Sequence, residues 1–88
     1  MFGQRIIDFG RHFENRLDKD LLDGALDYVN FNEETLALEI LCDHLSEYAI
    51  QFTQKEYCEL CVLLKDMGLD ELECPYKYLK NQVLVRSA

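Results

Sequence analysis

The sequence predicts an all-α protein, a small single-domain bundle of four to five helices that spans residues 1–88. Four segments repeat their apolar residues three or four positions apart, which is the period of one face of an α-helix. An alternating pattern that would indicate a strand occurs only at the Val83 to Val85 end. The composition, with 49% hydrophobic and 30% charged residues, is typical of a globular chain that folds around its own core.

The first two helices are expected near the N-terminus. Over residues 2–17 the apolar positions recur at helical steps, and Gly10 weakens this helix by up to about 1 kcal/mol relative to alanine. Over residues 21–29 the apolar side chains fall on one side of a helical wheel, opposite three acids. These acids are Asp20, Asp23 and Asp27.

The third helix is expected to be central and the most buried. Asn32 offers a side-chain oxygen as N-cap, and Glu33 and Glu34 place negative charge at the positive end of the helix dipole. The apolar residues of 37–49 span roughly 200° of the wheel, which is too wide for a helix with a single neighbour. The remaining wedge carries acids at successive i,i+4 positions, namely Glu39, Asp43 and Glu47.

The clearest local signals bracket the fourth helix. Thr53 and Glu56 have the spacing of a capping box, in which each side chain accepts a hydrogen bond from the other residue's backbone N–H. Phe52 is placed to pack on Tyr57 as a hydrophobic staple, and Gly68 suits the left-handed position that follows a helix. We therefore expect the helix to begin at Thr53 and to end before Gly68.

A short fifth helix is expected after residue 74. Pro75 is favoured at a first helical position, and Tyr76, Leu79 and Val83 follow at helical spacing. No internal repeat, low-complexity tract or linker interrupts the chain, which supports a single domain.

The four cysteines invite a metal or redox interpretation. Cys58 and Cys61 have the spacing of a zinc-binding or dithiol pair. Their position inside the fourth helix, among apolar residues, favours plain core packing instead. A metal or thiol protein that uses Cys42, Cys58, Cys61 and Cys74 is the alternative.

The two histidines show no catalytic context. His44 lies at the edge of the apolar arc and is interpreted as a satisfied interior or boundary histidine, and His12 lies on a polar face with no evident partner. No glycine loop for phosphate and no nucleophile motif is present. The sequence therefore predicts no enzyme, no catalytic residue, no metal site and no cofactor.

Charge is concentrated in one part of the chain. The net charge is −8, and residues 14–47 alone hold ten acids against two basic residues, whereas the first thirteen residues carry +1 and the last forty-one carry −1. Such a surface repels nucleic acids and anionic membranes and attracts basic proteins. Because the chain has no run of about 18 apolar residues and no secretory signal, a soluble cytoplasmic protein with reduced thiols is expected.

A resemblance narrows the class of partner. Residues 28–69 resemble the small bacterial immunity proteins of the MafI type, including contact-dependent growth inhibition (CdiI-type) immunity proteins. The residues that carry it are Asn32-Glu33, Leu36-Ala37-Leu38-Glu39, Leu41-Cys42, Leu45, Glu47 and Met67-Gly68-Leu69. The resemblance implies a stoichiometric inhibitor of a cognate toxin C-terminal domain, and the partners of such proteins include basic nucleases, among them EndoU-type ribonucleases.

The partner-binding residues follow from the geometry of the acidic positions. We expect Glu39, Asp43 and Glu47 to form the main contact, acting as phosphate surrogates toward lysine and arginine. A second contact is expected at Asp20, Asp23 and Asp27, and whether the two sets share one face is left open. The free protein is expected to be a monomer or small oligomer. The alternative is an acidic structural or adaptor subunit that docks a basic protein in a permanent complex.

Overall fold

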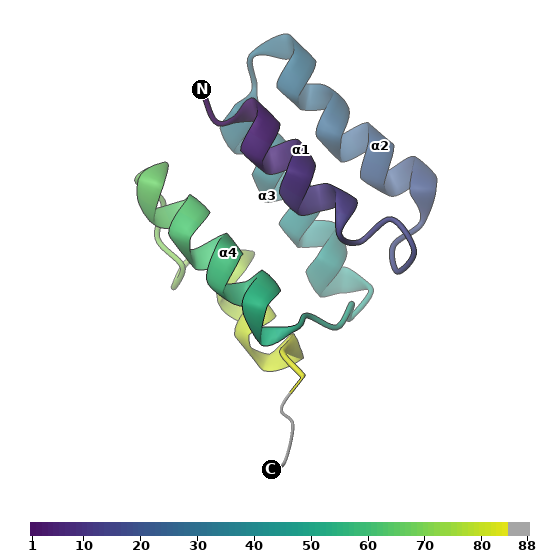
Figure 1. Ribbon diagram of the computed structural model, residues 1–88, viewed down its shortest axis with the longest axis vertical. Helices are drawn as coiled ribbons and strands as arrows, with labels where there is room; N and C mark the ends of the chain where they lie inside the picture. Colours follow the sequence, from purple (N-terminus) through teal and green to yellow (C-terminus); the bar gives the residue numbers. More distant parts are fainter. Residues whose placement is uncertain (85–88) are drawn as a thin grey trace.

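The all-α prediction is confirmed by a computed structural model that describes residues 1–84 (Figure 1). These residues form four α-helices and two 3-10 helices. In chain order they are α1 (Gly3–Arg11), α2 (Lys19–Asp27), η1 (Tyr28–Phe31), α3 (Glu34–Glu47), α4 (Gln54–Asp66) and η2 (Tyr76–Gln82).

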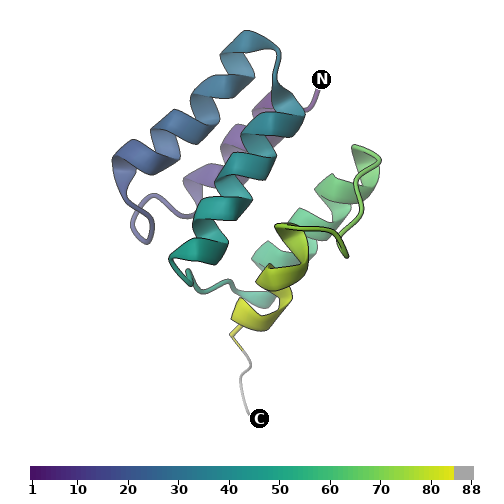
Figure 2. The ribbon, with the colours of Figure 1, turned by 180° about the vertical axis from the view of Figure 1, so that it is seen from behind.

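Helix α3 is the central element, as its wide apolar arc predicts. It packs against α1, α2, η1 and η2. In Figure 1, α1 and α4 lie in front of α3, and α2 lies beside α1. Seen from behind in Figure 2, α3 and η2 lie in front and α1 lies at the back. Helix α3 thus has α1 on one side and no helix of the described chain on the opposite side.

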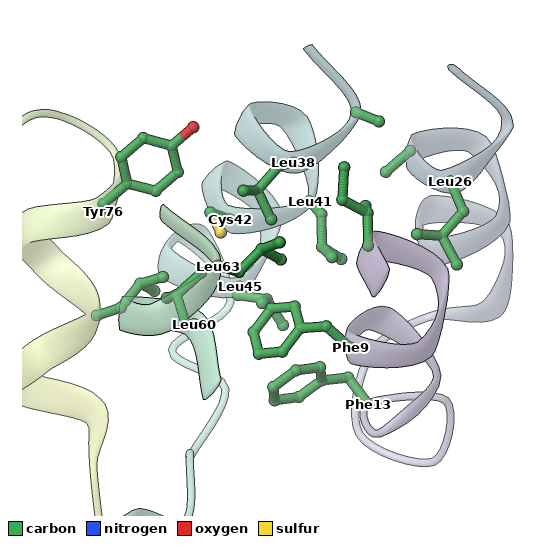
Figure 3. Close-up of a cluster of buried hydrophobic side chains, with 14 of the residues drawn as sticks. Phe9, Phe13, Leu26, Leu38, Leu41, Cys42, Leu45, Leu60, Leu63 and Tyr76 are labelled. Atoms are coloured by element: carbon green, nitrogen blue, oxygen red, sulfur yellow. The ribbon is translucent and has the colours of Figure 1, made fainter. Parts of the chain in front are cut away.

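The core gathers apolar side chains from α1, α2, α3, α4 and η2 (Figure 3). Leu41 and Leu45 of α3 are fully buried in this cluster. Three phenylalanines from separate segments stack at one end, with ring centroids 5.3 Å apart for Phe9 and Phe13 and 4.9 Å apart for Phe13 and Phe52. These spacings are those of favourable aromatic pairs, so the trio joins α1 to the segment before α4.

The first helix ends earlier than the sequence periodicity predicts. Helix α1 stops at Arg11 and residues 12–16 form turns, in which the Leu17 N–H donates to the Phe13 carbonyl at 2.8 Å. The side chain of Arg16 also donates to the His12 carbonyl at 2.6 Å, which satisfies a carbonyl at the helix end. Because the turns keep Phe13 and Leu17 buried, the predicted apolar face is confirmed although the helix is shorter.

Asn32 does not cap α3, so that prediction is wrong. Its backbone adopts the left-handed conformation, with φ 59°, and ends η1 by donating its N–H toward the Val29 carbonyl. Asparagine tolerates this conformation better than most residues do. Helix α3 follows Glu33 without a side-chain cap, and the Glu34 carboxylate instead accepts a hydrogen bond from the Phe2 N–H at 3.1 Å.

The boundaries of α4 are confirmed. Thr53 and Glu56 form both hydrogen bonds of the capping box. The rings of Phe52 and Tyr57 pack edge to face, 6.5 Å apart, and Gly68 has a φ of 74°. Each of these signals acts within about one helical turn, which explains why the sequence could reveal them.

The short fifth helix is present as the 3-10 helix η2. It buries Tyr76 and Leu79 against the core beside α3. At its end the Gln82 amide donates to the carbonyls of Leu45 and Ile50, at 2.9 and 2.7 Å. The C-terminal segment thus closes over the link between α3 and α4.

Candidate functional site

The main predicted contact, which we name the α3 strip, is exposed and has no ion-pair partner among residues 1–84. The α3 strip consists of Glu39, Asp43 and Glu47. None of these carboxylates lies within 4.0 Å of a basic nitrogen among residues 1–84. At four-residue spacing, successive members lie about 6 Å apart along the helix axis. The strip therefore presents a row of negative charge to its surroundings.

The second predicted contact, the α2 strip, is partly engaged within the molecule. The α2 strip consists of Asp20, Asp23 and Asp27. Asp23 accepts hydrogen bonds from Lys19 at 2.7 Å and from Arg11 at 3.0 Å, and these two cations lower the pKa of its carboxyl. Asp27 accepts a hydrogen bond from the Asn30 amide at 3.0 Å. Only the charge of Asp23 is therefore balanced before any partner binds, because Asp20 and Asp27 form no ion pair within residues 1–84.

The two strips do not share a face. Asp23 and Asp27 line a groove between α1 and α2, together with Arg11. The α3 strip borders η2 instead: burial raises the pKa of Tyr76, and the nearby Cys42 and Glu39 add to this effect. Helices α1 and η2 lie on opposite sides of the bundle (Figures 1 and 2). A rigid partner that covers the α3 strip would therefore leave most of the α2 strip uncovered.

The basic side chains of the described chain lie in other parts of the bundle, where several form ion pairs. Arg5 pairs with Asp66 at 3.0 Å, and Arg16 pairs with Glu56 at 2.6 Å, so both ion pairs join α1 or its following turn to α4. The lysines of η2, Lys77 and Lys80, line a hollow beside Tyr57 and Leu72. That hollow lies between α4 and η2, and neither lysine comes within 4.0 Å of a carboxylate of the α3 strip.

Exposed apolar residues beside the α3 strip were missed by the sequence reasoning. Leu36 is 36% exposed and Phe31 is 67% exposed, and both lie at the start of α3. The helical wheel holds the missing signal for Leu36, because it lies seven and eleven positions before Asp43 and Glu47 and so falls on the acidic wedge. No local signal distinguishes Phe31 from a core residue.

The prediction that the cysteines pack in the core is only partly confirmed. Cys42 is buried as expected, but Cys58 is exposed and Cys61 is half-buried, so the prediction is wrong for Cys58. Helix α4 buries one narrow face, and Cys58 falls outside it. Cys74 is exposed as well. Within residues 1–84 no group of three or more histidine, cysteine or acidic side chains is arranged to hold a metal ion.

Both histidines differ from expectation. His44 has a buried Nδ1 with no hydrogen-bond partner in the described chain, so it is not fully satisfied. His12, expected to lack a partner, has its Nε2 2.9 Å from a carboxylate oxygen of Glu59. Because these residues are 47 positions apart, no sequence window could pair them. Their contact adds another link between the turn after α1 and α4.

Comparison of the chain with protein-family models, curated proteins and solved structures gives no match. Across residues 1–84, none of the helices has the length and apolarity needed to span a bilayer.

Proposed function

We propose that this protein binds and neutralises a basic toxin domain, in the manner of an immunity protein, with a nuclease as the expected target. The observation that carries the proposal is the α3 strip, a row of exposed carboxylates with no cation of residues 1–84 beside it. Like charges four residues apart cost a helix about 0.2–0.5 kcal/mol per pair. A docked cationic surface would offset that cost.

The mechanism follows from what a nuclease must recognise. A nuclease holds phosphates with lysine and arginine side chains, and carboxylates on a rigid helix can occupy the same groups. Helix α3 is well suited to this role because it is the central element of the bundle and its inner face is fixed by buried residues such as Leu41. Occupied by the α3 strip, the cleft of the nuclease would no longer admit nucleic acid.

The test uses the C-terminal domain of the protein encoded immediately upstream. Co-expression with this chain should restore bacterial growth, and the complex should weaken between about 0.1 M and 1 M salt, as the Debye length falls from about 10 Å to about 3 Å. Failure of the wild-type chain to protect against a toxic domain would reject the proposed function.

A matched pair of variants tests the contact residues. Changing Glu39, Asp43 and Glu47 to lysine should slow association and abolish protection without loss of helicity. The control changes three exposed acids outside α3 to lysine, and so alters the net charge equally. These acids are Asp8, Glu14 and Glu73. Full protection by the α3 variant, or equal loss in both variants, would reject the assignment of the α3 strip.

The alternative of an acidic adaptor subunit predicts a different behaviour. A subunit of a permanent complex has a large apolar interface and is poorly behaved when isolated. Leu72 is the observation that favours this alternative, because it is 75% exposed. Sedimentation of the isolated chain separates the two proposals: a stable monomer or small oligomer is expected of an inhibitor, and concentration-dependent aggregation of a subunit.

A further inference from the structure

The outer face of α3 combines apolar and acidic side chains in an ordered way. At 100° per residue, Leu36, Asp43 and Glu47 fall within an arc of about 40°, and all are exposed. Ile40, half-buried, lies one turn after Leu36 at the edge of the same arc. The buried Leu41 falls on the opposite side of the helix, toward the core. The face therefore carries Leu36 and Ile40 beside Glu39 in its first part, and Asp43 and Glu47 in its second part.

Phe31 is a second exposed apolar side chain, three residues before the start of α3. It ends η1, directly before the left-handed turn at Asn32, and is 67% exposed. Aromatic side chains are among those that contribute most binding energy at protein interfaces when they enter a pocket of the partner. Phe31 and Leu36 are thus two exposed apolar side chains, five positions apart at the N-terminal end of α3.

The groove between α1 and α4 is less suited to a basic partner. The groove between α1 and α4, about 570 Å³ in volume, holds Arg5, Lys55 and His12 together with acids. Two of these side chains already pair with acids of α4, at 3.0 and 2.9 Å. Since opposite charges balance within that groove, it has little attraction for a basic surface. The outer face of α3 lacks such balance.

We infer that the outer face of α3 docks a partner that presents an apolar pocket bordered by lysine or arginine side chains. Phe31 and Leu36 enter the pocket, and the α3 strip meets the basic border. This inference rests on the proposed function and specifies the partner's surface. Exposed charges mainly set the association rate, whereas buried apolar contacts mainly set the dissociation rate. The apolar side chains and the acids of this face therefore have separable kinetic effects.

The experiment measures binding kinetics with a catalytically inactive form of the domain encoded immediately upstream. Leu36→Ala and Phe31→Ala should each raise the dissociation rate constant about tenfold, with little change in association or in salt dependence. Replacement of the three acids of the α3 strip by glutamine should lower the association rate constant about tenfold and flatten its salt dependence. Leu72→Ala, which trims an exposed leucine in the link between α4 and η2, is the control and should change neither constant.

The outcomes separate this inference from the proposed function. If the apolar variants dissociate like wild type, or if Leu72→Ala alone dissociates faster, the docking face is wrong even when growth is protected. If all variants behave as expected but the active domain is not toxic, the docking face is supported and the inhibitor function is rejected. If no complex forms at micromolar concentrations, both are rejected. Circular dichroism of each variant confirms that the fold is retained.

Discussion

Two helical glycines should respond in opposite ways to the same substitution. Gly10 in α1 is buried, and a Cβ atom built on it would lie 2.8 Å from Cδ2 and 3.2 Å from Cδ1 of Leu26. Gly24 in α2 is exposed, and a Cβ there would meet nothing within 4 Å. Alanine is otherwise favoured over glycine in a helix by about 0.5–1 kcal/mol. Only Gly10 has a packing reason to remain glycine.

The magnitudes follow from these surroundings. Gly24→Ala should raise the free energy of unfolding by about 0.5–1 kcal/mol. For Gly10→Ala the same gain is opposed by overpacking, which typically costs about 1–3 kcal/mol. Leu26 is only 5% exposed and three of its carbon atoms lie within 3.4 Å of the new methyl group, so rotating one methyl group away gives little relief. We expect a net loss of about 1 kcal/mol, which lowers the midpoint of thermal unfolding by about 4–8 °C.

The assay is thermal and urea unfolding followed by circular dichroism. Leu26→Val supplies a second background, because valine lacks the two δ-methyl groups that crowd residue 10. In that background Gly10→Ala should no longer destabilise, and should approach the gain seen for Gly24→Ala. The packing explanation is refuted if Gly10→Ala stabilises the wild-type protein, or if its loss is unchanged by Leu26→Val.

Three further predictions concern contacts elsewhere in the bundle. Glu56→Gln keeps a capping acceptor but loses the ion pair with Arg16, whose hydrogen bond lowers the pKa of Glu56. It should cost about 0.5–1 kcal/mol at pH 7. The ion pair stabilises the folded protein above the pKa of an unfolded glutamate, about 4.3. Urea unfolding at a series of pH values should therefore show this cost vanish as the pH falls through the lower pKa that Glu56 has in the folded protein. Mass spectrometry after brief alkylation should find Cys74, with its lowered pKa, modified well before Cys61, where burial and Glu71 raise the pKa to about 11. Gln82→Ala should cost about 1–3 kcal/mol in urea unfolding, because the Ile50 carbonyl loses its donor and the Leu45 carbonyl keeps only the Ile50 N–H.

The parts of the fold that the sequence predicted depend on neighbours in the chain. The capping box at Thr53 and the left-handed Gly68 act over a few residues, and both are confirmed. The early end of α1 depends on Arg16, whose side chain reaches the Gln51 carbonyl 35 positions away and Glu56 40 positions away. An asparagine at position 32 could cap α3 or adopt the left-handed conformation that ends η1. Only tertiary packing decides between these two roles.

In the candidate site, too, the sequence predicted the features that depend on one helix and not those that depend on contacts between helices. A helical wheel suffices to place Asp43 and Glu47 on an exposed face, because that face is a property of one helix. It cannot reveal that Asp23 is neutralised by Arg11, twelve positions earlier on another helix. Nor can it show that the α2 and α3 strips point in different directions, since that depends on how the helices pack. The partner itself stays a prediction.

The contacts of Gln82 bear on the order in which the protein is assembled during translation. Its amide serves the carbonyls of Leu45, within the last turn of α3, and of Ile50, just beyond it. While the ribosome has released α1, α2 and α3 but not yet residue 82, the Ile50 carbonyl must rely on water, and the Leu45 carbonyl has only the Ile50 N–H, 3.0 Å away. The nascent chain can therefore form its helices early, but the end of α3 gains these hydrogen bonds only in the final stage of synthesis.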